Sequence, residues 1–349
     1  MKIEKRLGIL TGGGDCPGLN AAIRATAKSA FKIGYEVIGL RDGWEGLLYN
    51  KIEVLDGVKT SNIIDRGGTI LGASRTSPFH IENGPQQVLE KFEALGLRAV
   101  VVLGGEGTLN VSSQLFDMGL PVVGIPKTID NDVKKTDYTI GFQTAVQIAT
   151  DALDRLRSTA ASHHRVMLLE VMGRYTGWIA TYAGTACGAD AILIPEIPVD
   201  EQSLEELYQM LVVRNKKGMK FSIVVVSEGI KLQGKAIFKS HYSKDKADSR
   251  NVLGGVGQVL GELINNNTDL STRVSSLGYI QRGGTPVAYD RSLATAFGVK
   301  AVELVEENKY GEMAALKGNR ITSVPLKEVA SGIKAVNLNT FRIAKMFFN

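Results

Sequence analysis

The sequence predicts an α/β protein with parallel sheets, and two observations lead to this prediction. Five short hydrophobic runs rich in β-branched residues recur along the chain, and each ends in a cluster of glycine or charged residues. Such runs are typical of buried parallel strands. Segments with helical spacing lie between runs, as parallel connections require. The runs are Leu7–Thr11, Val100–Leu103, Val122–Ile125, Val166–Val171 and Ile223–Val226.

Periodicity also predicts the main helices and a further strand. Leu19–Lys32 has helical spacing and Tyr35–Leu40 has the pattern of a strand, so the chain starts with a βαβ unit. Phe142–Arg157 is an alanine-rich helix, and Asp290–Glu306 is a helix that we expect to return to a first domain. The 349 residues suffice for two domains, and we place the transition near Gly141.

The ends of the five runs carry glycine together with Asp, Glu, Lys, Thr and Arg. In open α/β sheets, ligands bind just beyond the carboxyl ends of the strands. The sequence therefore predicts a single polar site that is assembled from distant stretches of the chain.

Composition excludes several classes of protein. The net charge is +5, but the 41 basic residues are dispersed among 36 acidic ones, so a nucleic-acid partner is not expected. No apolar stretch reaches the roughly 18 residues of a membrane span, and the first residues lack the apolar core of a signal peptide. We expect a soluble, cytoplasmic protein without a membrane partner. The two cysteines, Cys16 and Cys187, are expected to be reduced thiols.

The first glycine cluster, Thr11–Asn20, follows a strand and precedes a helix. Glycines at such a turn allow the backbone N–H groups to approach a phosphate. The cluster is neither a dinucleotide-binding fingerprint, which needs a glycine where Pro17 stands, nor a P-loop, because no Gly-Lys-Ser/Thr triplet follows. A tight turn without a ligand remains the alternative.

Two further clusters point to phosphoryl transfer. Gly104–Thr108 adds the carboxylate of Glu106, which suits Mg²⁺ on a polyphosphate. Lys127–Asp132 places two carboxylates, an amide, a hydroxyl and an ammonium within six residues of a strand end. Transfer to a sugar hydroxyl needs one carboxylate to accept the proton and a second charge for the metal or phosphate. Asp130 and Asp132 suit these roles.

With these clusters the chain resembles the 6-phosphofructokinase family, from the first strand to at least Arg291. The resemblance rests on seven motifs in the family's order, which are the segments 13–20, 66–72, 128–132, 172–174, 195–196, 227–229 and 277–284. It implies two Rossmann-like three-layer α/β/α domains with the active site in the cleft between them. The expected domains are 1–141 with about 282–325 for the phosphoryl donor, and 142–281 with about 326–349 for fructose 6-phosphate.

The resemblance also implies roles for individual residues. Asp130 is the expected base that takes the proton from the 1-hydroxyl of fructose 6-phosphate, with Thr128 and Arg174 near the transferred phosphoryl group. The expected sugar-phosphate contacts further include Asp132, Met172, Gly173, Glu228, Tyr279 and Arg282. The expected donor contacts are Gly13, Arg75, Gly105, Gly107 and Thr108, with Glu106 as the Mg²⁺ ligand. Arg165 and Arg273 match arginines that reach a neighbouring subunit's site, so we expect a homodimer or homotetramer.

The donor prediction depends on two positions that disagree. Gly107 resembles family members that use ATP, because an aspartate there blocks the α-phosphate of ATP by bulk and like charge. Lys127 resembles members that use diphosphate, and one hypothesis is that it contacts the γ-phosphate. We favour ATP, and diphosphate is the alternative donor. A sugar-phosphate or nucleotide sensor without catalysis is the alternative from another class, against which the intact Thr128, Asp130 and Arg174 argue.

Overall fold

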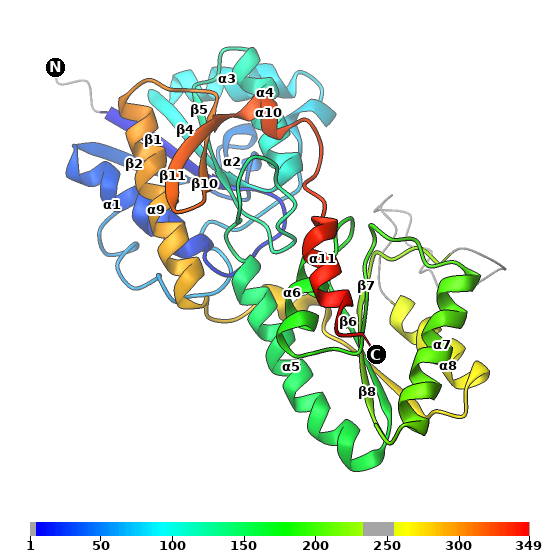
Figure 1. The fold of residues 1–349 in the computed structure, drawn as a ribbon. Coiled ribbons are helices and arrows are strands. Elements are labelled where there is room, and N and C mark those ends of the chain that lie inside the picture. The colour runs from blue at the N-terminus through cyan, green and yellow to red at the C-terminus, as the bar shows by residue number, and fades with distance from the viewer. Residues whose placement is uncertain (1–4, 233–254, 349) are drawn as a thin grey trace. The chain divides into compact units, whose positions relative to one another are not determined.

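The computed structural model describes residues 5–232 and 255–348, which form two compact units. The first unit comprises the chain as far as Thr144 together with Arg282–Lys334, and the second comprises Ala145–Gln281 together with the chain from Ala335 on. Each unit contains a β-sheet with helices on its faces, and the central strands of both sheets run parallel (Figure 1). The predicted fold of two α/β domains is confirmed.

The described part of the first unit contains a seven-stranded sheet in the order β11-β10-β5-β4-β1-β2-β3. Its five central strands run parallel, and the edge strands β3 and β11 pair antiparallel to their neighbours. Three of the predicted runs form the adjacent strands β1, β4 and β5. The strands are β1 (Lys5–Thr11), β2 (Tyr35–Leu40), β3 (Ile52–Leu55), β4 (Leu97–Gly104), β5 (Val122–Pro126), β10 (Glu312–Lys317) and β11 (Arg320–Pro325).

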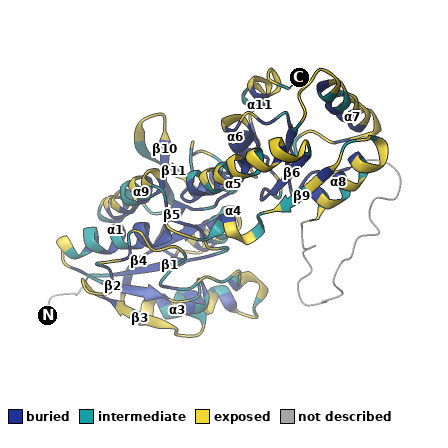
Figure 2. Ribbon diagram, turned by 90° about the horizontal axis from the view of Figure 1, so that it is seen from below, coloured by how far each residue is buried: buried dark blue, intermediate teal, exposed yellow. Residues whose placement is uncertain are grey.

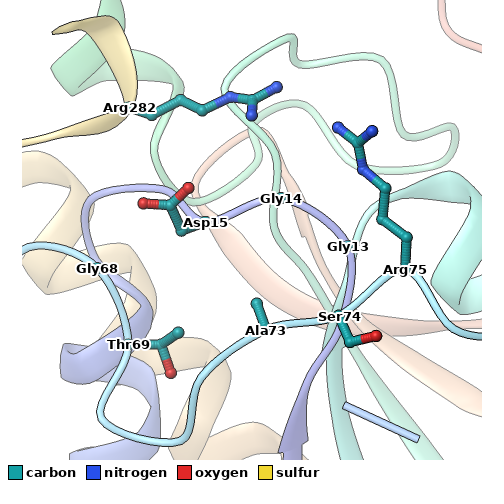
Figure 3. Close-up of a pocket in the computed structure, with 9 residues that line it drawn as sticks. All are labelled: Gly13, Gly14, Asp15, Gly68, Thr69, Ala73, Ser74, Arg75 and Arg282. Atoms are coloured by element: carbon teal, nitrogen blue, oxygen red, sulfur yellow. The ribbon is translucent and has the colours of Figure 1, made fainter. Parts of the chain in front are cut away.

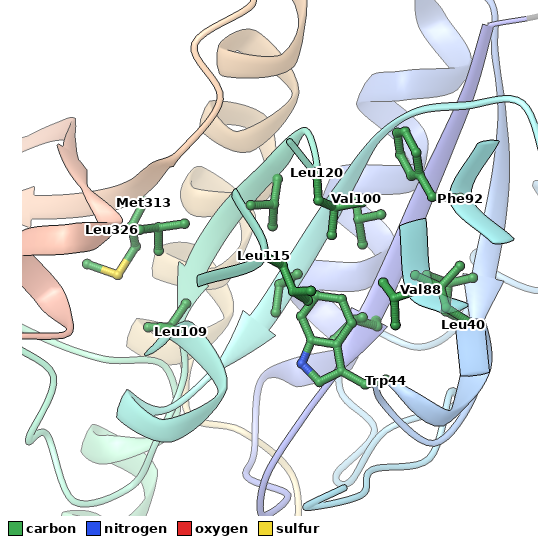
Figure 4. Packing of buried hydrophobic residues seen from close by; sticks show 14 of the residues in the cluster. Leu40, Trp44, Val88, Phe92, Val100, Leu109, Leu115, Leu120, Met313 and Leu326 are labelled. Carbon is green, nitrogen blue, oxygen red and sulfur yellow. The ribbon is translucent and has the colours of Figure 1, made fainter. Parts of the chain in front are cut away.

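Helices cover both faces of this sheet. Helices α1 and α9 pack together on one face, and α3, α4 and α10 lie on the other (Figures 1 and 2). On the second face Trp44 is buried in a cluster with Leu40, Val88 and Leu115 (Figure 4), so its indole serves the core. The helices are α1 (Leu19–Lys32), α2 (Glu45–Leu48), α3 (Gly84–Ala94), α4 (Glu106–Asp117), α9 (Ala288–Glu306) and α10 (Leu326–Val329), with a 3₁₀ helix at Pro78–His80.

The second unit has a smaller sheet in the order β7-β8-β6-β9, with all described pairs parallel. The remaining two predicted runs form its central strands β6 and β8. Helices α7 and α8 share a core with these strands, and α6 and α11 pack together. The elements are α5 (Phe142–His163), β6 (Val166–Val171), α6 (Trp178–Ala186), β7 (Ala191–Leu193), α7 (Glu201–Lys216), β8 (Ser222–Ser227), α8 (Val256–Asn267), β9 (Thr272–Ser276) and α11 (Leu338–Lys345), with a 3₁₀ helix at Gly278–Arg282.

A buried carboxylate determines where α5 begins. Asp290 of α9 accepts hydrogen bonds from the backbone N–H groups of Gly141 (3.0 Å) and Thr144 (2.8 Å) and from the Thr144 hydroxyl (2.6 Å). These bonds satisfy N–H groups that the first helical turn leaves without a partner. Burial raises the pKa of Asp290, and the three donors oppose this shift. The helix therefore starts at Phe142, and it extends to His163, beyond the predicted end at Arg157.

The C-terminal boundary differs from the prediction. The chain enters the second unit at Ala335 and not near residue 326. The reason is packing, because Leu326 and Val329 of α10 are buried in the core of the first unit. The backbone N–H of Lys334 also donates to the carbonyl oxygen of Asp132 at 2.7 Å. Within the described residues, no helix combines the length and the apolar character that crossing a membrane requires.

Candidate active site

In the first unit, the glycine turn after β1 borders a pocket of about 450 Å³ (Figure 3). Strands β1 and β4 are neighbours in the sheet, but the helices that follow them, α1 and α4, lie on opposite faces. Open α/β sheets bind ligands at such a point, and the glycine turn lies there. Gly13 has a φ of +82° and its N–H donates to the carbonyl oxygen of Ser74 at 2.8 Å, so the turn is tied to a second loop. The lining residues are Gly13, Gly14, Asp15, Gly68, Thr69, Ala73, Ser74, Arg75 and Arg282.

The pocket carries two guanidinium groups. The side chains of Arg75 and Arg282 both extend beside the glycine turn (Figure 3). A Cβ at Gly14 would lie only 3.4 Å from the Arg282 Nη1 atom, so glycine allows the arginine to approach the turn closely. Guanidinium groups bind phosphate oxygens in a fixed geometry. The structure thus brings together Gly13, Arg75 and Arg282, for which the sequence predicted donor and sugar-phosphate contacts.

The segment that carries Arg75 is held by a carboxylate that the sequence analysis missed. Glu45 of α2 accepts hydrogen bonds from the hydroxyl groups of Ser74 (2.9 Å) and Thr76 (2.6 Å), on either side of Arg75. The Lys51 ammonium donates to the same carboxylate at 2.7 Å. The hydrogen bonds from Lys51, Thr76 and Ser74 lower the pKa of Glu45 to about 2.

Lys127 lies beneath the glycine turn. Its side chain is buried, and its ammonium donates to the carbonyl oxygens of Gly12 and Gly14, each at 2.6 Å. Burial lowers the pKa of Lys127, and the positive charges of Arg282 and Arg75 act in the same direction. Two of the three N–H donors of the ammonium are therefore engaged by the backbone of the turn.

The second glycine cluster is the first turn of a helix. Gly105 is the N-cap of α4, and Glu106, Gly107 and Thr108 are its first residues. A helix N-terminus favours anions through its unpaired N–H groups. The Thr108 side chain packs closely against Gly12. A Cβ on Gly12 would lie only 2.6 Å from the Cγ2 atom of Thr108. Gly107 is exposed, and a Cβ there would have no neighbour within 4 Å.

The loop after β5 carries the candidate base. The Thr128 hydroxyl oxygen accepts the N–H of Asp130 at 3.2 Å, a local bond typical of a turn. Burial raises the pKa of Asp132, and the negative charge of Glu106 raises it further. Glu106, in the first turn of α4, and Asp132, in the loop after β5, therefore interact electrostatically.

These acidic residues fit a magnesium ion. Mg²⁺ in kinases is held by one or two carboxylates together with phosphate oxygens and water. Glu106 supplies such a carboxylate at the start of α4, and the nearby charge of Asp132 is one that a cation would compensate. Among the described residues, no group of three or more His, Cys, Asp or Glu side chains forms a protein-only metal cluster.

In the second unit, the predicted sugar contacts follow the adjacent strands β6 and β8. The Gly173 carbonyl oxygen accepts bonds from the Ser227 hydroxyl (2.7 Å) and the Gly229 N–H (3.2 Å), which join the two strand ends. A Cβ at Gly229 would lie 2.0 Å from the Arg174 carbonyl oxygen, so only glycine fits. Met172, Gly173, Arg174 and Glu228 therefore lie at one end of this sheet.

Other predicted contacts of this unit lie elsewhere. Arg165 directly precedes β6, and Arg273 of β9 lies beside Met167, near the start of β6. Met172 follows the opposite end of β6. With a rise of about 3.3 Å per residue, these ends are roughly 20 Å apart. Tyr279 is 76% exposed, in the 3₁₀ helix after β9.

A second contributor that sequence reasoning missed is Lys334. Burial lowers its pKa to about 8, and the charges of Asp137 and Asp132 oppose this shift. Its ammonium donates to the side chain of Asn131, the neighbour of Asp130. No motif includes Lys334, which is about 200 residues away in sequence, so no local signal pointed to it.

The fold and the loops at its strand ends define an α/β protein with sites suited to phosphates. Residues 6–305 match the phosphofructokinase family, and the chain belongs to that family. It is therefore a phosphotransferase of the kinase type.

Named relatives differ in their phosphoryl donor. The chain is 45% identical over 346 residues to the pyrophosphate–fructose 6-phosphate 1-phosphotransferase of Dictyoglomus thermophilum, which covers 99% of both chains. It is 46% identical over 342 residues to the ATP-dependent 6-phosphofructokinase of Chloroflexus aurantiacus, covering 95% of this chain and 93% of that protein. The crystal structure of Pichia pastoris phosphofructokinase superposes with a TM-score of 0.82 and 29% identity over 99% of this chain, which spans 36% of the yeast chain.

Proposed function

We propose that this protein transfers the γ-phosphoryl group of ATP to the 1-hydroxyl of D-fructose 6-phosphate, forming fructose 1,6-bisphosphate in glycolysis. The sugar acceptor is supported by the family and by the names of relatives with either donor. The choice of ATP rests on one observation, the open space at Gly107 at the start of α4. An aspartate there would repel and obstruct the α-phosphate, and glycine imposes neither obstacle.

Each residue has a proposed part in the reaction. Asp130 accepts the proton of the 1-hydroxyl as this oxygen attacks the γ-phosphorus, and the bond between the γ-phosphorus and the bridging oxygen breaks to release ADP. Arg174 supplies positive charge to the phosphoryl group during transfer, with Thr128 beside it. Met172, Gly173, Glu228, Asp132, Tyr279 and Arg282 position the sugar phosphate, while Gly13, Arg75, Gly105, Gly107 and Thr108 position the donor. Mg²⁺, which Glu106 would hold, neutralises phosphate charge when bound.

Diphosphate is the second candidate donor, because Lys127 resembles the residue of members that use it and a named relative at 45% identity does so. Initial rates with Mg²⁺, fructose 6-phosphate and either ATP or diphosphate decide between the donors. Turnover with ATP alone is the expected result, and turnover with diphosphate alone would overturn the donor assignment. Sugar-phosphate binding without turnover on either donor would favour a sensor.

We further propose that the enzyme is a homodimer or homotetramer in which Arg165 and Arg273 complete a partner's site. Their position some 20 Å along β6 from Met172 supports this, because an arginine side chain does not bridge that distance. The test is complementation. Chains with Asp130→Ser and chains with Arg165→Met should regain activity after they are unfolded and refolded together, since mixed oligomers contain sites with both residues intact. No recovery in mixed oligomers would contradict the proposal.

A further inference from the structure

The side chain of Lys334 has a complete set of hydrogen-bond partners on one loop. An ammonium group has three N–H donors and no acceptor. In Lys334 they reach the Asn131 Oδ1 atom (3.0 Å), the Thr136 carbonyl oxygen (2.8 Å) and the Asp137 carbonyl oxygen (2.9 Å). All three oxygens belong to the segment that directly follows Asp130.

The backbone around Lys334 binds the same loop. Its N–H donates to the carbonyl oxygen of Asp132 at 2.7 Å, and Ile333 forms an antiparallel bridge with Val133. A short stretch of the C-terminal chain thus lies alongside the loop as a strand would. The contact involves both main chain and side chain, so its geometry is tightly defined.

Asn131 transmits this contact to its neighbour Asp130. Its φ is +51°, a left-handed conformation that Asn tolerates better than most residues. The Oδ1 atom that receives Lys334 also accepts the Thr139 N–H at 3.1 Å, and the Thr139 hydroxyl donates to the Thr128 carbonyl oxygen at 2.7 Å. These bonds close the loop from Thr128 to Thr139 around Asn131, which is buried.

We propose that Lys334 is a positioning residue that holds Asn131, and through it the Thr128–Asp132 segment, in the conformation that presents the carboxylate of Asp130. A displacement of a reacting group by about 1 Å can cost up to about 10²-fold in rate. Lys127 acts on a different loop, the glycine turn, so Lys334 affects the proton-accepting group and not the donor loop. The kinetic consequence rests on the proposed function, but the structural consequence does not.

The test compares Lys334→Met with Lys135→Met. Lys135 is a neighbouring, exposed lysine on the same loop that forms an ion pair with Glu328 at 2.9 Å, and such pairs contribute little. Lys334→Met is expected to lower kcat by about tenfold to a hundredfold while KM for fructose 6-phosphate and donor changes less than about threefold. Lys135→Met should leave both constants unchanged. Lys334→Arg, which keeps the charge and donors, should recover part of kcat.

Amide hydrogen exchange provides a readout independent of activity. Lys334→Met should accelerate exchange of the Thr139 N–H, which donates to Asn131, and leave the Gly12–Gly14 turn unchanged. A double-mutant cycle combines Lys334→Met with Asn131→Gly. The fall in kcat caused by Lys334→Met should largely disappear when the Asn131 side chain is absent.

Each outcome decides the proposal. Unchanged kcat in an active, folded Lys334→Met enzyme, or additive effects in the cycle, would overturn it. A uniform rise in exchange throughout the first unit would instead show a general structural role and would also overturn it. If the wild type turned over neither donor, the proposed function would fail, and local exchange around Thr139 would still decide whether Lys334 holds this loop.

Discussion

The ammonium nitrogen of Lys127 lies 2.6 Å from the carbonyl oxygen of Gly12, at the base of the turn that borders the pocket. A second bond of the same length reaches Gly14. These contacts make Lys127 a support of the glycine turn, whichever donor approaches that turn. Lys127 resembles the residue of family members that use diphosphate. Because its ammonium supports the turn, this resemblance is only weak support for diphosphate as the donor.

Lys127→Met is expected to lower turnover with ATP and with diphosphate alike, because both donors need the turn in its present shape. It should also lower the free energy of unfolding by about 1 to 3 kcal/mol, the typical cost of leaving buried carbonyl groups without donors. Steady-state kinetics with each donor and chemical denaturation measure the two effects. Loss of diphosphate use alone, with stability intact, would instead support direct phosphate contact by Lys127.

Gly107→Asp should alter donor preference without harming the fold. Apart from its two chain neighbours and the helix's own backbone, no residue lies within 4 Å of a Cβ at this position, and an acidic residue in the first turn of a helix is favourable. We expect kcat/KM for ATP to fall by about tenfold or more through like-charge repulsion. Gly107→Ala is the matched control that adds bulk without charge. An unchanged preference in the aspartate variant would remove the main support for ATP.

Asp130→Ser should abolish most turnover, with a loss of roughly 10² to 10⁴-fold in kcat as expected for a missing general base. Binding of fructose 6-phosphate, followed by calorimetry, should be retained. Asp137→Asn is the control, because that carboxylate belongs to the same loop but accepts the Gly318 N–H at 2.6 Å. Near-normal kcat in Asp130→Ser would show that another group accepts the proton.

Glu45 should make stability depend on pH in the acid range. Its folded-state pKa of about 2 lies below the ordinary value of 4.5, so its stabilisation is complete above about pH 4.5 and is lost as the pH falls toward 2. After allowance for solvent screening, the Glu45 carboxylate contributes about 1 to 2 kcal/mol to the free energy of unfolding. Chemical denaturation at pH 7 and pH 3 measures the free energy of unfolding of the wild type and of Glu45→Gln. The difference between the two proteins should be smaller at pH 3 than at pH 7. A constant difference would mean that the charge of Glu45 is unimportant.

Much of the fold was predictable from local pattern. The run Val166–Val171 and the helix Leu19–Lys32 coincide with β6 and α1, because β-branched runs and helical spacing are properties of neighbouring residues. The helix at Asp290 begins two residues earlier than predicted, at Ala288. The C-terminal boundary was wrong because burial of Leu326 and Val329 in the first unit is a long-range effect that no local pattern encodes.

The sequence by itself determined the strand-end motifs, the family to which they belong, and the types of group available for chemistry, because these depend on residue identity and order. Only the tertiary structure decided what each group contacts: that Lys127 binds the glycine turn, that Glu45 holds the segment around Arg75, and that Lys334 holds Asn131. The physical reason is that hydrogen bonds and burial join residues remote in sequence, and their partners exist only once the chain has folded.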